Sequence, residues 1–206
     1  GMGIDLQEAR AQDGKYIQIF NNVIINATYS LYLFGRSENV LFYNNTMLDT
    51  YDSENGLGQF DIYPVQGAYN KNIYSPDISY NCVFKNNIFT KPIRTQLEAN
   101  ATLFDADKHN VFENNVYASN SLTEYVTYNY GGTGPTLTFS GLQAYGDMGH
   151  EANGIYEPVD FVDADSDGRL SGSSNPAVTA ATDTITDTVS APATDILGKT
   201  RTREAG

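Results

Sequence analysis

The sequence predicts an all-β fold in which short parallel strands wind into a β-solenoid of about four to five coils. The main observation is a pattern that occurs four times: an apolar strand, an Asn-Asn pair and a second apolar strand. The first asparagines of the pairs are Asn21, Asn44, Asn86 and Asn114, so the spacings are 23, 42 and 28 residues. Spacings of this size are typical of stacked units that bury their faces against one another. Because each unit consists of strands, a parallel β-solenoid is predicted rather than a helical array.

The Asn-Asn pair itself predicts a sharp corner between the two strands of each unit. Asparagine tolerates the left-handed backbone region that such a corner needs. Asparagine side chains on successive coils are also able to stack and to form hydrogen bonds along the solenoid axis. The alternative is that the pairs are turn residues of an antiparallel protein. Hairpin turns favour Asn-Gly, however, and none of the four pairs has that form.

Each coil is expected to contain three strands, the first two of them joined by the Asn-Asn corner. The expected strands are 16–20, 23–25 and 30–34 in the first coil, 39–43, 46–48 and 59–63 in the second, and 80–84, 88–89 and 102–107 in the third. A fourth coil is expected to start at Asn110. A Tyr- and Asn-rich insertion, residues 65–77, accounts for the longest spacing.

The chain is expected to form one domain, residues 1–206, in three parts. Residues 1–15 are predicted to be a partial coil or end cover, residues 16–122 the regular coils, and residues 123–206 irregular closing coils with a strap. One short helix is predicted over 138–145, with Ser140 as its N-cap. The tail has no apolar period, so it is predicted to be an extended strap over the last coil.

Composition excludes several function classes. The formal net charge is −13, which argues against nucleic acid or an anionic membrane as a partner. The sequence has no apolar run of about 18 residues, so no transmembrane helix is predicted. No signal peptide is visible at the start of the sequence. The single cysteine, Cys82, is predicted to be a buried core residue, and an intrachain disulfide is excluded.

The third strands carry the candidate functional residues. Alignment of their apolar positions places Tyr32, Asp61 and Asp105 in one outward-facing row, because side chains alternate along a strand. Neighbouring strands lie roughly 4.8 Å apart, so Asp61 and Asp105 are expected to be adjacent carboxylates. Such a pair suits acid catalysis on a glycosidic bond or a Ca²⁺ ion that holds a uronate. Alternatively, the outward carboxylates are solubilising charges that oppose aggregation.

Aromatic, basic and acidic residues are expected to border this row. Tyr32 and Tyr63 are able to stack on sugar rings, and Asp107 is expected beside Tyr63 in the next row. Basic side chains in the bordering loops are candidates to bind or deprotonate an acidic sugar. They are Lys91, Arg94, Lys108 and His109.

A second acidic cluster lies at Asp163, Asp165 and Asp167, followed by Gly168. It matches the first half of the D-x-D-x-D-G calcium-loop pattern. Ser174 stands where that pattern has its bidentate glutamate, so a helix–loop–helix calcium site is not expected. An ordinary Asp/Gly turn is the alternative to a Ca²⁺ site at these three residues.

The Asn-Asn coils resemble the right-handed parallel β-helix proteins of the pectate-lyase-like group. The C-terminal segment is similar to the closing segment of secreted bacterial β-helix proteins, many of them active on polysaccharides. The residues that carry this similarity are 138–146, 151–155, 158, 160–163, 168–170, 174–177 and 194–201. The resemblance implies a right-handed, single-stranded β-helix, an extracellular or cell-surface location, and a basic catalytic residue with Ca²⁺ held by acidic side chains. Arg94 and Lys91 are available for that role, although neither lies in a matching family motif.

The leading hypothesis is an extracellular polysaccharide-active protein, a polysaccharide lyase or glycoside hydrolase, that acts on or binds an acidic glycan along the third strands. The alternative is a non-catalytic carbohydrate-binding or adhesin-like solenoid module. A third hypothesis is a trimeric viral tail-spike fragment. Since enzymes of the resembling group have more coils, this chain is expected to be the C-terminal part of a longer protein. An open solenoid end also predicts a homodimer.

Overall fold

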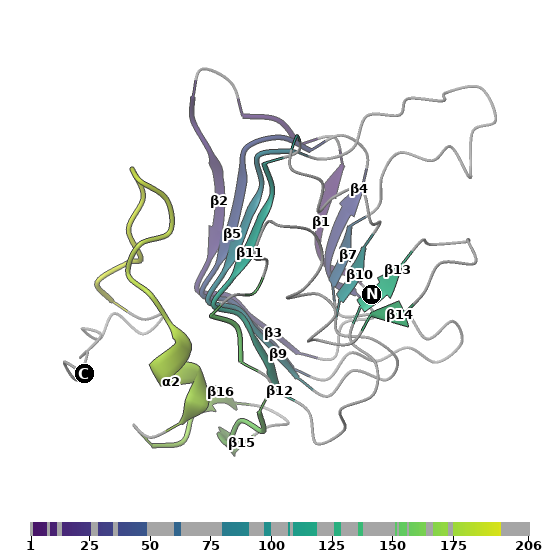
Figure 1. Ribbon diagram of the computed structural model, residues 1–206. Helices are drawn as coiled ribbons and strands as arrows, with labels where there is room; N and C mark the ends of the chain where they lie inside the picture. Colours follow the sequence, from purple (N-terminus) through teal and green to yellow (C-terminus); the bar gives the residue numbers. More distant parts are fainter. Residues whose placement is uncertain are drawn as a thin grey trace.

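The computed structural model describes the four Asn-Asn units, strands that follow them and much of the C-terminal segment (Figure 1). The described residues are 2–7, 9–11, 14–25, 29–34, 37–48, 60–62, 80–90, 97–99, 107, 109–118, 126–128, 136–137, 151, 153–155, 157–163, 167–172 and 175–194. This part is almost entirely β-strand, and most strands pair in parallel. The all-β prediction and the prediction of parallel strands are therefore confirmed.

Three sheets contain most of the strands. Sheet A has the order β1-β4-β7-β10-β13-β14 and consists of β1 (Met2–Gln7), β4 (Tyr29–Phe34), β7 (Phe60–Ile62), β10 (Leu97–Ala99), β13 (Val126–Tyr128) and β14 (Thr136–Leu137). Sheet B consists of β2 (Ile17–Phe20), β5 (Val40–Tyr43), β8 (Val83–Lys85) and β11 (Val111–Glu113). Sheet C consists of β3 (Val23–Ile25), β6 (Thr46–Leu48), β9 (Ile88–Thr90) and β12 (Val116–Ala118).

The chain enters sheets B, C and A in turn, and one such set of three strands is called a repeat below. The described residues contain four consecutive repeats: β2-β3-β4, β5-β6-β7, β8-β9-β10 and β11-β12-β13. Equivalent strands of successive repeats pair in parallel, and β1 adds a strand to sheet A ahead of the first repeat. Sheets B and C meet at the Asn-Asn corner, and sheet A stands across from sheet B (Figure 1).

The Asn-Asn corner has the backbone that the sequence predicts. The first asparagines of the four pairs, Asn21, Asn44, Asn86 and Asn114, have φ between 55° and 57°. This left-handed conformation costs asparagine less than most other residues. A second left-handed column lies five residues earlier, at Asn39, Asn81 and His109.

The second asparagines form a hydrogen-bonded ladder that crosses all four repeats. In each step the backbone N–H and the side-chain Nδ2 of one asparagine donate to Oδ1 of the next. The Nδ2–Oδ1 distances are 2.9 Å from Asn22 to Asn45, 3.1 Å from Asn45 to Asn87 and 3.0 Å from Asn87 to Asn115. Asn45, Asn87 and Asn115 are 0% exposed. Each Nδ2 also donates to a backbone carbonyl, so these buried amides are satisfied.

An apolar row of sheet B packs beside this ladder. The register places Ile19, Phe42, Phe84 and Phe112 opposite one another in successive strands. The three phenylalanines are at most 2% exposed. The rings of Phe84 and Phe112 stack with their centroids 4.6 Å apart. Stacked aromatic pairs contribute roughly 1 kcal/mol beyond the area that they bury.

The C-terminal strap, residues 175–194, lies outside sheets B and C (Figure 1). It begins with the short helix α2 (Pro176–Ala180), whose N-cap Asn175 accepts a hydrogen bond from the Ala177 N–H. Ala177 packs against Ile88 and Val116 of the last two repeats. The Thr182 N–H then donates to Asn86 Oδ1 at 2.9 Å, and Asn86 Nδ2 donates back to the Thr182 carbonyl at 2.7 Å.

The strap continues along the molecule to the first repeat. Ile185 is 1% exposed and packs against Leu41, Tyr43 and Val83 on the outer side of sheet B. Asn21 Nδ2 donates to the Thr194 carbonyl at 3.3 Å. The strap was expected over the last coil, but it runs back across the repeats to the first one. The reason is that Leu41 and Tyr43 alternate with the inward Val40 and Phe42, so an apolar outer face needs a cover.

Two further features complete the described part. β15 (Phe161–Asp163) and β16 (Asp167–Leu170) form an antiparallel pair. The helix predicted over 138–145 lies outside the described residues. Among the helices that the structure describes, none has the length and apolar character needed to cross a membrane.

Candidate functional site

The candidate site is one register row of sheet A. Parallel pairing places Asp5 opposite Tyr32, Tyr32 opposite Asp61, Asp61 opposite Glu98, and Glu98 opposite Thr127. We call these five residues the sheet A row. Residues of one row lie on the same face of a sheet, because successive residues of a strand alternate between its two faces.

The neighbouring rows of sheet A are apolar, in contrast to the sheet A row. One of them pairs Ile4, Leu31 and Phe60. The other contains Leu6, Leu33, Ile62, Ala99 and Tyr128. By alternation these two rows share one face and the polar row has the other. The sequence pattern of sheet A therefore separates an apolar face from a face that carries three acidic positions.

The alignment of the third coil differs from the expectation. Asp105 was predicted to lie beside Asp61, but the strand that pairs with β7 on that side is β10, which places Glu98 opposite Asp61. The other side of β7 pairs with β4, so no edge of β7 remains for Asp105. The residue itself lies outside the described part. The error arose because the loop after the third Asn-Asn pair is shorter than assumed, which moves the strand forward from 102–107 to 97–99.

Adjacent carboxyl positions set the chemistry that the sheet A row can support. Paired strands lie about 4.8 Å apart, so the register places two acidic residues, Asp61 and Glu98, at neighbouring positions of the row. Carboxylate oxygens are the ligands that Ca²⁺ prefers. Tyr32 occupies the next position of the same row. The row therefore combines acidic, aromatic and hydroxyl groups at regular intervals.

Most of the predicted bordering residues are not in the described part. Tyr63, Lys91, Arg94 and Lys108 lie outside it. Asp107 is exposed. His109 is exposed too, and its left-handed φ of 54° places it in the corner column before sheet B. This backbone role gives His109 a structural explanation that does not involve a sugar.

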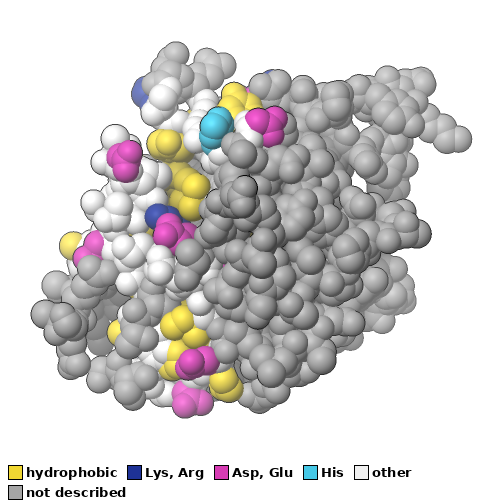
Figure 2. Space-filling model, viewed as in Figure 1, with side chains coloured by type: hydrophobic (Ala, Val, Ile, Leu, Met, Phe, Trp, Pro, Cys, Tyr) yellow, Lys and Arg dark blue, Asp and Glu magenta, His cyan; other side chains and the backbone are white. Residues whose placement is uncertain are grey.

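The second acidic cluster coincides with the β15–β16 pair. Asp163 and Asp167 are register partners in antiparallel strands, and Asp165 lies outside the described residues. The ordinary-turn alternative fits this arrangement, because a chain reversal between paired strands favours Asp and Gly. Within the described residues no group of three or more Asp, Glu, His or Cys side chains is able to hold a metal ion. Figure 2 shows acidic side chains scattered among uncharged ones on the face in view.

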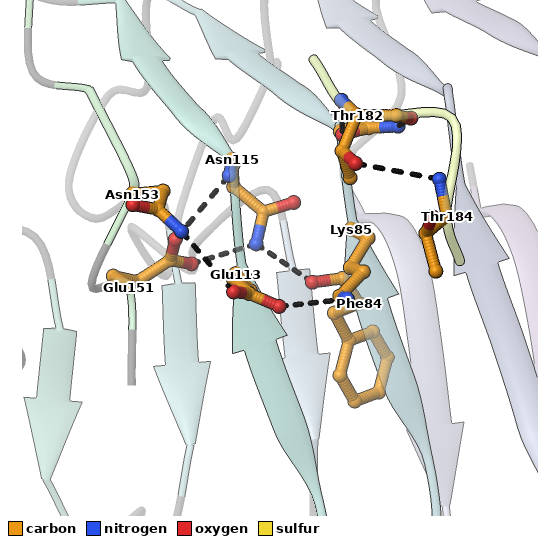
Figure 3. Close-up of polar contacts among 9 residues, drawn as sticks. Phe84, Lys85, Glu113, Asn115, Glu151, Asn153, Thr182 and Thr184 are labelled. Carbon is orange, nitrogen blue, oxygen red and sulfur yellow. Dashed lines mark hydrogen bonds and ion pairs between the residues drawn. The ribbon is translucent and has the colours of Figure 1, made fainter. Parts of the chain in front are cut away.

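Sequence reasoning missed the residue that ends the asparagine ladder. Glu151 is 0% exposed and has a left-handed φ of 55°. Asn115 donates from Nδ2 to Glu151 Oε1 at 2.6 Å and from its backbone N–H to Oε2 at 3.3 Å (Figure 3). The carboxylate thus takes the place that the next asparagine would occupy. Charged acceptors form stronger hydrogen bonds than neutral ones, which suits the end of a buried row.

An ion pair lies outside the corner, near the end of the ladder. Lys85 Nζ is 2.7 Å from Glu113 Oε2, and Asn153 Nδ2 donates to Glu113 Oε1 at 3.2 Å (Figure 3). Lys85 and Glu113 are register partners in adjacent strands. The pair joins the last two repeats and the segment that contains Glu151, and this supports a structural role.

Cys82 is buried, as predicted. It is 0% exposed, and burial raises the pKa of its thiol to about 12, with a smaller increase from Glu38 and a lowering contribution from the Val40 backbone. Because the thiolate is the nucleophilic form, Cys82 is not a candidate catalytic residue.

No protein-family model, curated protein sequence or solved structure matches this chain. The resemblance to pectate-lyase-like proteins therefore stays a prediction.

Proposed function

We propose that this chain is a right-handed parallel β-helix that binds an acidic polysaccharide along sheet A, with Ca²⁺ between the glycan and the protein. The observation that carries the proposal is the sheet A row, in which parallel register aligns Asp5, Tyr32, Asp61 and Glu98. The row places one residue per strand at regular intervals, and three of its five residues are acidic. Such a surface suits a polymer, which also repeats along its length.

Calcium is part of the proposal because of the sign of the charges. An acidic glycan and a row of carboxylates repel each other, and the whole chain adds a net charge of −13. A Ca²⁺ ion between protein and sugar carboxylates removes this repulsion and supplies oxygen coordination. Extracellular modules bind Ca²⁺ with dissociation constants of about 10⁻⁴ to 10⁻³ M, so the proposed location is extracellular.

Whether the protein also cleaves the glycan is a separate question, and the same glycans can be used to answer it. Elimination needs a base beside the row, and the basic candidates Lys91 and Arg94 lie outside the described residues. Unsaturated products of elimination absorb ultraviolet light. A protein that retains the glycan without producing this absorbance is a carbohydrate-binding module, and one that produces it is a lyase.

The test measures binding of polygalacturonate, alginate and chondroitin by affinity electrophoresis, with Ca²⁺ or with a chelator. Asp61→Asn and Glu98→Gln remove charges from the row, and Asp187→Asn removes an exposed charge from the strap as a matched control. We expect Ca²⁺-dependent retention of at least one glycan, weakened about tenfold by either row substitution and unchanged in the control. Absence of retention with Ca²⁺, or equal retention by all variants, contradicts the proposal.

A further inference from the structure

The first repeat ends in an edge that no described segment covers. β2 and β3 are the terminal strands of sheets B and C, whereas sheet A continues beyond β4 with β1. At this end sheets B and C are therefore one strand shorter than sheet A. We call this end of sheets B and C, formed by the outer edges of β2 and β3, the first-repeat step. An edge of this kind presents backbone N–H and C=O groups that are able to pair with another strand.

Burial falls sharply at the first-repeat step. Val40 and Phe42 of the second repeat are 0% exposed, but their partners Ile17 and Ile19 in β2 are only partly buried. Phe20 is 39% exposed, with its ring stacked on Tyr43 at a centroid distance of 5.1 Å. The edge strand β2 therefore carries incompletely covered apolar side chains on both faces, with Ile17 and Ile19 on the inward face and Phe20 on the outer face.

The asparagine ladder gives this edge a direction. Every bond in the ladder is donated toward the C-terminal repeats, and Oδ1 of Asn45, Asn87 and Asn115 each accepts two bonds. Asn22 donates in the same way, but in the described part of the chain no donor reaches its Oδ1. The opposite end accepts its last bonds on Glu151. The first-repeat step therefore offers an acceptor where an asparagine amide would complete the series.

We propose that the first-repeat step binds a strand–Asn–Asn–strand segment of another polypeptide, which adds one parallel strand to β2 and one to β3. The second asparagine of that segment donates its N–H and Nδ2 to Asn22 Oδ1, as Asn22 itself donates to Asn45. An aromatic residue just before its Asn-Asn pair stacks on Phe20, as Phe20 stacks on Tyr43. Strand addition of this kind gains affinity from main-chain bonds and specificity from side-chain positions.

The polarity of the ladder disfavours a second intact copy of this chain as the occupant. Two copies that meet at this end place two Asn22 acceptors against each other, and each copy carries a net charge of −13. The other end of a second copy presents Glu151, whose carboxylate is also an acceptor. Neither end supplies the missing donor, whereas a segment with a free asparagine amide does.

The probe is a fluorescein-labelled peptide with the sequence of residues 38–48, ENVLFYNNTML. The matched control peptide carries Asn45→Asp, which keeps the shape of the side chain but replaces the donor by an acceptor. Binding to the whole protein is measured by fluorescence anisotropy, and light scattering gives the mass of the protein alone. On the protein side, Asn22→Ala removes the acceptor, and Glu157→Gln changes an exposed residue outside the ladder and the first-repeat step.

We expect saturable binding of the Asn peptide to a monomeric protein. Binding should weaken about fivefold to tenfold with the Asp control peptide and with Asn22→Ala, and should not change with Glu157→Gln. Equal binding of the Asn and Asp peptides to the unaltered protein overturns the proposal, whatever Asn22→Ala does to folding. Absence of binding at several hundred micromolar peptide overturns it too. A dimer that excludes the peptide overturns it in favour of a second copy as the occupant.

Discussion

Two regions of the molecule differ in how regular they are from repeat to repeat. The corner between sheets B and C is the same in each repeat, whereas the segments that flank sheet A differ in length. At the corner, Asn45, Asn87 and Asn115 occupy equivalent positions, and consecutive rungs are joined by the same pair of hydrogen bonds. The distance along the chain from one rung to the next nevertheless varies, from 23 to 42 to 28 residues. All of that variation lies in the segments that lead to and from sheet A.

This difference indicates that the two regions have different roles. The corner fixes the register of every strand, because a slip of one residue would exchange a buried amide for an apolar side chain. The segments beside sheet A carry no such constraint, and long loops cost little free energy per added residue. Variable loops on a rigid scaffold are a frequent location for binding residues, and the proposed glycan row lies in this sheet.

The largest effect is expected at the centre of the ladder. Asn87→Leu leaves two donors of Asn45 and the Phe42 carbonyl without their partner. Each buried unsatisfied group costs about 1 to 3 kcal/mol, so the free energy of unfolding should fall by roughly 4 kcal/mol. Urea denaturation measures this change. Asn22→Leu at the first rung should cost only about 1 kcal/mol, and equal losses at both positions would show that the ladder does not control stability.

The next effect concerns the end of the ladder. Glu151→Ala removes both acceptors of Asn115, so we expect a loss of about 3 kcal/mol in the same denaturation experiment. Glu151→Gln keeps one acceptor but brings an amide donor against another, and about 1 to 2 kcal/mol should be lost. A wild-type midpoint for Glu151→Ala would mean that water replaces the carboxylate without cost.

The third prediction compares a buried and an exposed apolar residue of the strap. Ile185→Ala removes a buried side chain from the contact with Leu41 and Val83, and we expect a loss of about 2 kcal/mol, at the low end for such truncations. Val178→Ala is the control, because Val178 is 45% exposed. Hydrogen exchange should increase in residues 182–194 for Ile185→Ala alone. Unchanged exchange would indicate that the strap is held by its hydrogen bonds and not by Ile185.

A fourth prediction tests whether water reaches the buried thiol of Cys82, directly before β8. The pKa of the Cys82 thiol is raised from 9.0 to about 12 by burial, so the unfolded chain loses this proton first as pH increases. Stability therefore decreases as pH rises from about 9 toward about 12. Between pH 8 and pH 10 the loss should be roughly 1 kcal/mol larger in the wild type than in Cys82→Ala. Identical pH profiles would show that the thiol is accessible to water in the folded state.

The smallest effect is expected for a change beside sheet A. Insertion of Gly-Ser-Gly between Asp52 and Ser53 lengthens the segment between β6 and β7, and about 0.5 kcal/mol should be lost. Insertion of one glycine between Asn86 and Asn87 breaks the ladder and should prevent folding. Circular dichroism and urea denaturation distinguish the two. Comparable damage from both insertions would remove the difference between the corner and the flanking segments.

The corner could be predicted from the sequence because its chemistry is local. A left-handed backbone at Asn44 and a stacked amide at Asn45 both follow from the residue type and from recurrence of the pattern. The position of β10 did not follow, since loop length rather than residue type decides where a third strand begins. The prediction therefore placed Asp105 at the position opposite Asp61 that Glu98 occupies.

The path of the strap and the role of Glu151 were missed for a different reason. Val40–Tyr43 is continuously apolar and buried on both faces, and this pattern is the signal that an outer cover exists. It does not say which segment provides the cover, because the contact joins residues more than one hundred positions apart. Glu151 lies outside any repeat of the Asn-Asn pattern, so only the coordinates show that its carboxylate continues the row.

All ladder hydrogen bonds are donated in the same direction along the repeats. This has a consequence for how the number of repeats can change in evolution. An interior asparagine such as Asn45 receives and passes on the same pair of bonds. Duplication or deletion of a whole unit in the interior would therefore leave the chemistry of both termini of the row unaltered. A unit can therefore be duplicated at any position between Asn22 and Asn115. The glutamate that ends the ladder, Glu151, needs to be present only once.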